Sequence, residues 1–194
     1  MSKVGIAVLL IGLALAGCQS AAPPISSVTP TETVVPNTPP PVSTPPPSPV
    51  HPIGVSINNQ APDFQMVTLT GENISLSGLR GRPVILNFWA TWCGPCRAEM
   101  PLLQQIHDEW APKGLVLLEI NWRDKPETIQ KFMTEFNLSM NVPMDSDGQV
   151  SKTYLIGSIP ATFFIDKDGI IRNKVIGAFP NKAAIESSLN LIMP

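Results

Sequence analysis

Two cysteines between an apolar run and a helical pattern constrain this chain more than any other feature. The run Val84–Trp89 is apolar on both faces of an extended chain, as a buried parallel strand should be. Cys93 and Cys96 follow it, and apolar side chains then recur at every third or fourth position, which predicts a helix. We therefore expect an α/β domain that carries the cysteine pair at the start of a helix.

The spacing of the two cysteines predicts thiol–disulfide chemistry. At the junction of strand and helix, free backbone N–H groups point at the sulfur of Cys93, favour its thiolate and lower its pKa. Cys96 lies one turn into the helix, where we expect it to be more buried and to act as the resolving thiol. Gly94 and Pro95 form the active-site loop between them, and Pro95 suits a first helical position because its missing N–H costs little there.

Two structural roles compete with the redox role of this pair. A zinc site needs four ligands, and the only additional histidines are His51 and His107, so we expect no metal. A purely structural disulfide with two residues between its cysteines would constrain the unfolded chain little. The order strand, Cys-x-x-Cys, helix therefore favours a redox pair.

The remaining pattern completes a mixed sheet. We expect a hairpin from residues 64–69 and 74–76, a buried strand at 115–120, a helix that opens at Pro126, and a short helix within 145–154. The turn 166–169 joins strands 161–165 and 170–176, and Asn181 caps a last helix that extends to Ile192. The predicted fold is α/β, with helices on both faces of a mixed central sheet and an N-terminal β-hairpin.

The N-terminus has the pattern of a targeting segment. Lys3 precedes an apolar run of thirteen residues, too short to cross a membrane as a helix but suited to a secretory signal. Residues 15–18, Leu-Ala-Gly-Cys, resemble the bacterial lipobox, which would lipidate Cys18 after removal of residues 1–17. An ordinary signal peptide with a chance cysteine is the alternative. Lipidation would anchor the protein to a membrane without spanning it.

Residues 18–58 have the composition of a tether. Twelve of the 22 prolines lie between Pro23 and Pro52, with few charged side chains among them. Such a segment buries too little apolar surface to fold, and its proline clusters favour an extended chain. A proline-rich ligand for a recognition domain is the alternative. The folded domain is predicted over residues 59–194.

The charge of the chain argues against some partners. The net charge is -2, so the sequence does not predict a basic surface that would bind nucleic acid. We expect a monomer that requires no cofactor. Its partners would be disulfide-bearing exported proteins and a thiol-reducing electron donor in the membrane.

The segment Asn87–Pro101, which reads Asn-Phe-Trp-Ala-Thr-Trp-Cys-Gly-Pro-Cys-Arg-Ala-Glu-Met-Pro, resembles the active-site segment of thioredoxins. It is most similar to the membrane-anchored TlpA/ResA-like branch, and the resemblance runs from about Ala61 to the C-terminus. It implies a thioredoxin-like fold and a thiol–disulfide oxidoreductase outside the cytoplasm, on the outer face of a bacterial membrane.

The resemblance implies further site residues. Pro160 matches the cis-proline that faces the disulfide, and Ile159 would offer its backbone to an extended substrate peptide. Glu99 matches a glutamate that manages the proton of the cysteine pair, although a carboxylate near a helix N-terminus is also favoured by the helix dipole alone. Asn87 replaces the buried aspartate of cytoplasmic thioredoxins and cannot shuttle a proton. Trp92 would pack beside the sulfurs and contact substrate, or merely pack on the surface.

Three functions are compatible with these features. The first is a reductase of disulfides in exported proteins, with apocytochrome c as the first guess for its substrate. The second is an oxidase or isomerase of secreted proteins, which runs the same site in the other direction. The third is a copper-handling or partner-binding lipoprotein without turnover, which is disfavoured because no histidine follows His107. A peroxiredoxin is disfavoured because its peroxidatic cysteine lies in a different motif.

Overall fold

The computed structural model describes residues 51–193. The predicted signal peptide, Cys18 and most of the predicted tether lie outside the described residues. Among residues 51–193, no helix combines the length and the apolar character that crossing a membrane requires.

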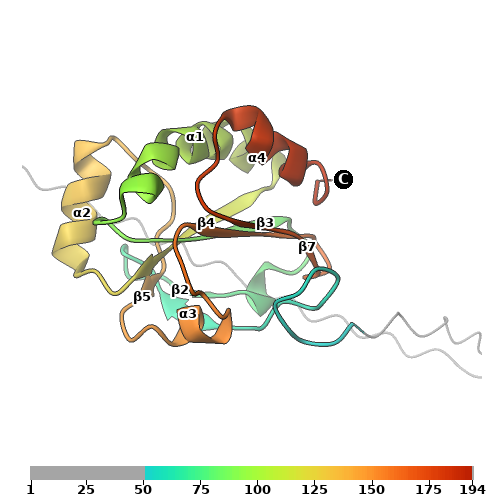
Figure 1. Ribbon diagram of the computed structural model, residues 1–194. Helices are drawn as coiled ribbons and strands as arrows, with labels where there is room; N and C mark the ends of the chain where they lie inside the picture. Colours follow the sequence, from blue (N-terminus) through green and yellow to red (C-terminus); the bar gives the residue numbers. More distant parts are fainter. Residues whose placement is uncertain (1–50, 194) are drawn as a thin grey trace, which may run out of the picture. The chain divides into compact units, whose positions relative to one another are not determined.

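A five-stranded sheet forms the centre of the domain (Figure 1). Its spatial order is β5-β4-β3-β6-β7, and β3 runs parallel to β4 and antiparallel to β6. All six residues of β3 are buried, which explains why its sequence is apolar on both faces. The strands span Val84–Trp89 (β3), Val116–Trp122 (β4), Met144–Asp145 (β5), Ala161–Ile165 (β6) and Ile171–Ile176 (β7).

Helices cover both faces of this sheet, which confirms the predicted fold class. Three helices cover one face: α1 (Gly94–Trp110), α2 (Pro126–Glu135) and α4 (Lys182–Leu189). The short helix α3 (Gln149–Thr153) lies on the other face, together with the antiparallel pair β1 (Gln65–Val67) and β2 (Asn73–Ser75) (Figure 1). Two 3₁₀ turns, η1 (Ser77–Leu79) and η2 (Ala111–Lys113), complete the described elements.

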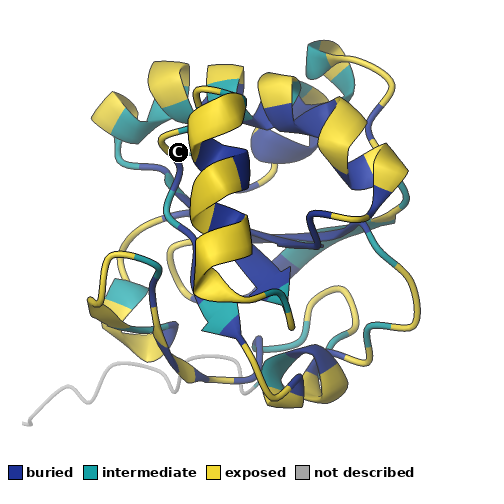
Figure 2. Cartoon of the chain, turned by 90° about the vertical axis from the view of Figure 1, so that its left-hand side faces the viewer, coloured by how far each residue is buried: buried dark blue, intermediate teal, exposed yellow. Residues whose placement is uncertain are grey.

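Each face of the sheet has its own apolar core. The helices carry buried residues on their inner sides and exposed residues on their outer sides, as Figure 2 shows. Under α1, α2 and α4 the core includes Trp89 and Met100, and on the opposite face Phe88 and Phe163 pack around Tyr154. The hydroxyl of Tyr154 donates to the carbonyl of Pro62 at 2.7 Å, so the aromatic ring can be buried without leaving its polar end unpaired.

The folded part begins before the predicted boundary at residue 59. The N–H of Asn58 donates to the carbonyl of Ile171, and the N–H of Ile171 donates to the carbonyl of Asn59. Gln60 forms a further antiparallel bridge with Ile170. Residues 58–60 thus add to the outer edge of the sheet beside the start of β7, a pairing that the proline-rich composition around them does not indicate.

Two other differences concern short or terminal elements. β5 has only two residues and was not predicted as a strand, because so short a segment carries no alternation of apolar and polar residues. The last helix begins after Asn181, whose side chain accepts from the N–H of Ala184 as predicted, but it ends at Leu189 instead of Ile192. Pro101 lies inside α1, and the helix continues beyond it to Trp110.

Candidate active site

The cysteine pair lies where strand β3 gives way to helix α1. Cys93 is the N-cap of α1 and Cys96 lies in its first turn, and the two sulfurs form a disulfide. The backbone N–H of Cys96 points at Sγ of Cys93 at 3.2 Å, which is the contact expected to favour a thiolate there. Cys93 retains 5% of its surface and Cys96 none, so an approaching molecule reaches Cys93 first.

The loop before β6 lies against the same sulfur. The peptide bond between Ile159 and Pro160 is cis, as predicted. Sγ of Cys93 lies 3.7 Å from the carbonyl oxygen of Ile159, which brings together residues that are 66 positions apart in the sequence. Pro160 is buried, whereas Ile159 is partly exposed.

Glu99 lies one turn beyond Cys96 and is fully buried. Its Oε1 accepts from Nδ2 of Asn87 at 2.9 Å, and its Oε2 accepts from the backbone N–H of Phe179 at 3.0 Å. Burial raises the pKa of Glu99 to about 7, although both hydrogen bonds act to lower it. A carboxyl group with this pKa can take up and release a proton near neutral pH, as a general acid–base requires.

A row of polar side chains crosses the sheet below Glu99. Thr162 of β6 and Glu119 of β4 are the in-register neighbours of Asn87 on β3, and all three are buried. Nδ2 of Asn87 donates to Oγ1 of Thr162 at 2.9 Å as well as to Glu99. Asn87 therefore uses one N–H bond of its amide to connect β3 with α1 and the other to connect β3 with β6.

Comparisons with known proteins agree with this geometry. The sequence model of the AhpC/TSA family matches residues 57–174, which include both cysteines. The thiol-disulfide oxidoreductase ResA of Oceanobacillus iheyensis is 38% identical over 142 residues, which cover 71% of this chain and 73% of that protein. ResA of Bacillus cereus is 34% identical over 72% of this chain and 80% of that protein.

The chain belongs to the AhpC/TSA family and to the ResA-like thiol–disulfide oxidoreductases.

Solved structures of related proteins have the same fold as this oxidoreductase. A thiol:disulfide interchange protein of the thioredoxin family from Chlorobium tepidum is 28% identical, with a TM-score of 0.64 over 72% of this chain and 99% of that one. StoA from Bacillus subtilis is also 28% identical, with a TM-score of 0.58 over 67% and 97%. The predicted thioredoxin-like resemblance is confirmed.

Trp92 projects outward beside the cysteines of the oxidoreductase. It is 64% exposed, and its ring centroid lies 6.1 Å from that of Trp122 at the end of β4. The side chain of Arg123 lies over the ring of Trp122 at 5.8 Å. The two indoles form an apolar surface beside the disulfide, to which Trp122 contributes by packing against Trp92.

Sequence reasoning missed three groups around the site. The carboxylate of Asp124 accepts from the backbone N–H of Thr91 at 2.7 Å and from the side chain of Asn121, which secures the loop before Cys93. The N–H of Phe179 comes from a loop 80 positions beyond Glu99, and no local pattern reveals that contact. Glu119 had a visible signal, because it is the one charged residue in a strand that is predicted to be buried.

The described residues contain no group of three or more His, Cys, Asp or Glu side chains arranged to hold a metal.

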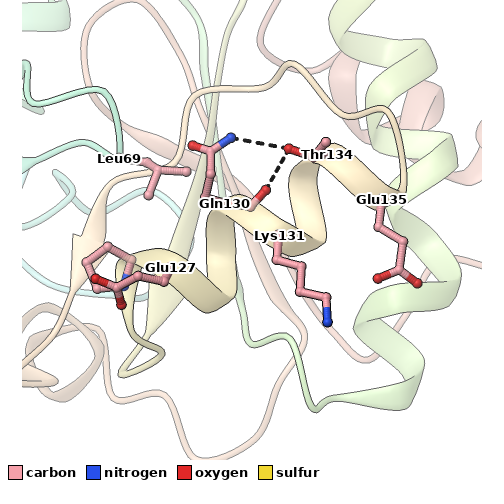
Figure 3. Close-up of a pocket in the computed structure, with 7 residues that line it drawn as sticks. Leu69, Glu127, Gln130, Lys131, Thr134 and Glu135 are labelled. Atoms are coloured by element: carbon pink, nitrogen blue, oxygen red, sulfur yellow. Dashed lines mark hydrogen bonds between the residues drawn. The ribbon is translucent and has the colours of Figure 1, made fainter.

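An open hollow of about 730 Å³ lies along α2 (Figure 3). Its wall is braced by hydrogen bonds between Gln130 and Thr134. Neither cysteine lines it, and the residues that do are Leu69, Pro126, Glu127, Gln130, Lys131, Thr134 and Glu135.

Proposed function

We propose that this oxidoreductase reduces disulfides in exported proteins, with Cys93 as the nucleophile and Cys96 as the resolving thiol. The asymmetry between the two sulfurs carries the proposal. Cys93 caps the helix, retains exposed surface and lies beside the Ile159 backbone, whereas Cys96 is wholly buried behind it. These contacts support Cys93, of the two, as the sulfur that meets a protein disulfide.

The reaction begins with the reduced pair. The Cys93 thiolate attacks one sulfur of a substrate disulfide, forms a mixed disulfide and releases the other substrate sulfur as a thiolate. Cys96 then loses its proton and attacks Sγ of Cys93, which releases the second substrate thiolate and forms the Cys93–Cys96 disulfide. Two electrons have passed to the substrate, whose two thiolates each take up a proton.

Glu99 is proposed as the base in the second step. It lies one helical turn from Cys96, it is fully buried, and its pKa of about 7 allows it to accept the thiol proton. It can then pass the proton to the departing thiolate. Asn87 has no group that exchanges a proton at this pH, and its proposed role is to hold the Glu99 carboxylate in place.

Peptide binding is proposed for the surface around Cys93. The backbone of Ile159 could pair with an extended substrate segment, and Pro160 would hold that loop against the disulfide. Trp92 would add an apolar contact next to the reacting sulfurs, because its ring is largely exposed and supported by Trp122. Gly94 and Pro95 form the exposed rim of the same surface.

The direction of electron flow is proposed from the dipeptide between the cysteines. Gly94-Pro95 is the pair found in thioredoxin, whose potential of about −270 mV is reducing, whereas DsbA at about −120 mV is a strong oxidant. An oxidase or isomerase is the alternative, since it would run the same site in the other direction.

The proposed location is outside the cytoplasm, with Cys18 lipidated and the proline-rich segment after it acting as a tether. The lipobox-like sequence at residues 15–18 and the proline-rich composition support this proposal. One of the similar structures, 28% identical with a TM-score of 0.59, is a disulfide oxidoreductase secreted by Mycobacterium tuberculosis. A membrane protein would supply electrons, and exported proteins, with apocytochrome c as one candidate, would receive them.

The equilibrium potential against glutathione tests the direction. The oxidised and reduced forms differ in whether Cys93 and Cys96 react with a thiol-specific reagent, so their ratio can be measured by mass. We expect a value close to about −270 mV. A value near that of DsbA would refute the reductase and favour the oxidase.

A further inference from the structure

Glu119 is a buried acid that the reaction described above does not use. It lies in the middle of β4 and has no exposed surface. Its in-register neighbour on the parallel strand β3 is Asn87, and such neighbours project from the same face of a sheet. Since Asn87 contacts Glu99 of α1, Glu119 also faces the layer that contains α1.

The hydrogen bonds around Asn87 leave a surplus of acceptors. Both N–H bonds of its amide are used, one toward Glu99 and one toward Thr162. Oδ1 of Asn87 and both carboxyl oxygens of Glu119 are buried and have no donor within residues 51–193. Three buried acceptors without a donor are costly, and a proton on one of them would supply the missing donor.

The surroundings of Glu119 favour that proton. Glu99 on α1 is the charged group that acts on it, and burial together with this charge raises the pKa of Glu119 well above its ordinary value. The buried residues of α2 are the apolar Ile129, Phe132 and Met133. Asp145 of β5 is occupied on the opposite face, where its carboxylate accepts from backbone N–H groups of α3.

We propose that Glu119 is a positioning residue that stays protonated and donates its O–H toward Oδ1 of Asn87. This bond holds the Asn87 amide with its oxygen toward β4 and its nitrogen toward Glu99. Without it, the amide could turn over and present Oδ1 to the Glu99 carboxylate, so that two acceptors would meet. The inference rests on the proposed role of Glu99, because it explains how that carboxyl is kept ready to accept a proton.

The test compares Glu119→Leu with Glu119→Gln, both in the oxidised full-length protein. Leucine has no donor, whereas the glutamine amide can still donate toward Oδ1 of Asn87. Carbon NMR of the glutamate carboxyl groups across a pH series reports the ionisation of Glu99 and Glu119 separately. We expect Glu119→Leu to raise the titration midpoint of Glu99 by about one to two pH units, as the loss of a hydrogen bond to a carboxylate would. Glu119→Gln should leave that midpoint unchanged.

Three results would overturn the inference. They are an unchanged Glu99 midpoint in Glu119→Leu, an equal shift in Glu119→Gln, and an ionised Glu119 in the wild-type protein at pH 7. The last result would mean that water or another group donates hydrogen bonds to the three acceptors. It would refute the proposed protonation of Glu119 even if Glu119→Leu does not fold.

The same data separate this inference from the proposed function. If Glu99 titrates as expected in each variant but Glu99→Gln retains full activity, the base assignment fails and the role of Glu119 stands. If Glu99→Gln loses activity but Glu119→Leu leaves the Glu99 midpoint unchanged, the base assignment stands and the role of Glu119 fails.

Discussion

The side chain of Asn87 donates from Nδ2 to Oε1 of Glu99 at 2.9 Å, in a place that water does not reach. Asn87 lies at the centre of the sheet and Glu99 on the helix that begins with the cysteine pair. The bond therefore fixes the only acid in the first two turns of α1 relative to the strands below it. Its strength affects both the reaction and the stability of the fold.

Replacing Glu99 with Gln should remove the proton acceptor for Cys96. Since the pKa of Glu99 is about 7, the rate of disulfide reduction by the wild type should rise as the pH passes through 7 and then level off. The variant should lose that rise and be slower by about 10²-fold on the plateau, as expected for the loss of general base catalysis. Steady-state reduction of a disulfide-bonded peptide measures both.

Glu135→Gln is the matched control, because Glu135 is an exposed glutamate on α2. It should retain the wild-type rate and pH profile. If Glu99→Gln did so too, Glu99 would have no part in proton transfer.

The raised pKa of Glu99 also makes stability depend on pH. The folded protein holds this proton up to a pH of about 7 and the unfolded chain only to about 4.5, so the contribution is present below 4.5 and is lost as the pH rises to 7. From the lower to the higher pH, the wild type should therefore lose on the order of 3 kcal/mol of unfolding free energy relative to Glu99→Gln. Urea unfolding of both oxidised proteins across this range measures the difference, and a difference independent of pH would contradict it.

Replacing Cys96 with Ser should trap substrates on Cys93. Cys93, which retains 5% of its surface, can still attack, but no thiol remains at position 96 to resolve the mixed disulfide, so the adduct should persist. Non-reducing gels followed by mass spectrometry would identify the partners. Cys93→Ser is the matched control and should trap far less, because Cys96 has no exposed surface. Equal trapping by both variants would contradict the assignment of nucleophile and resolver.

Replacing Trp92 with Ala should weaken substrate binding more than stability. The ring is 64% exposed, so its removal should change the unfolding free energy by less than about 0.5 kcal/mol. Because Trp92 is proposed to contact the substrate, its replacement should raise KM about tenfold and leave kcat nearly unchanged. Leu191→Ala is the control, because Leu191 is a similarly exposed apolar residue outside the site. An unchanged KM in Trp92→Ala would mean that the ring only packs against Trp122.

The parts of the fold that local patterns describe could be predicted from the sequence. The strand Val84–Trp89, the helix after Cys93 and the cap at Asn181 each depend on neighbouring residues, and the structure contains all three. The cis bond before Pro160 could be predicted only by resemblance, because nothing in the adjacent residues distinguishes it from an ordinary trans bond.

The missed contacts connect residues that are distant in sequence. Phe179 and Glu99 are 80 positions apart, and Thr91 and Asp124 are 33 apart, so each bond depends on how the layers pack. Burial of Cys96 could be anticipated from its place on the helix, but the partners of Glu99 could not. Glu119 differs from these contacts, because a charged residue within a strand predicted to be buried is visible in the sequence alone.

The pairing of residues 58–60 with the start of β7 has a consequence for solubility. An uncovered edge strand offers its free N–H and C=O groups to any other extended chain and invites aggregation. Here the N–H and the carbonyl of Ile171 are both occupied by Asn58 and Asn59. A protein shortened to begin at residue 61 would retain every catalytic group and yet expose a ready template for intermolecular β-pairing. Residues 58–60 thus protect the outer edge of the sheet against self-association.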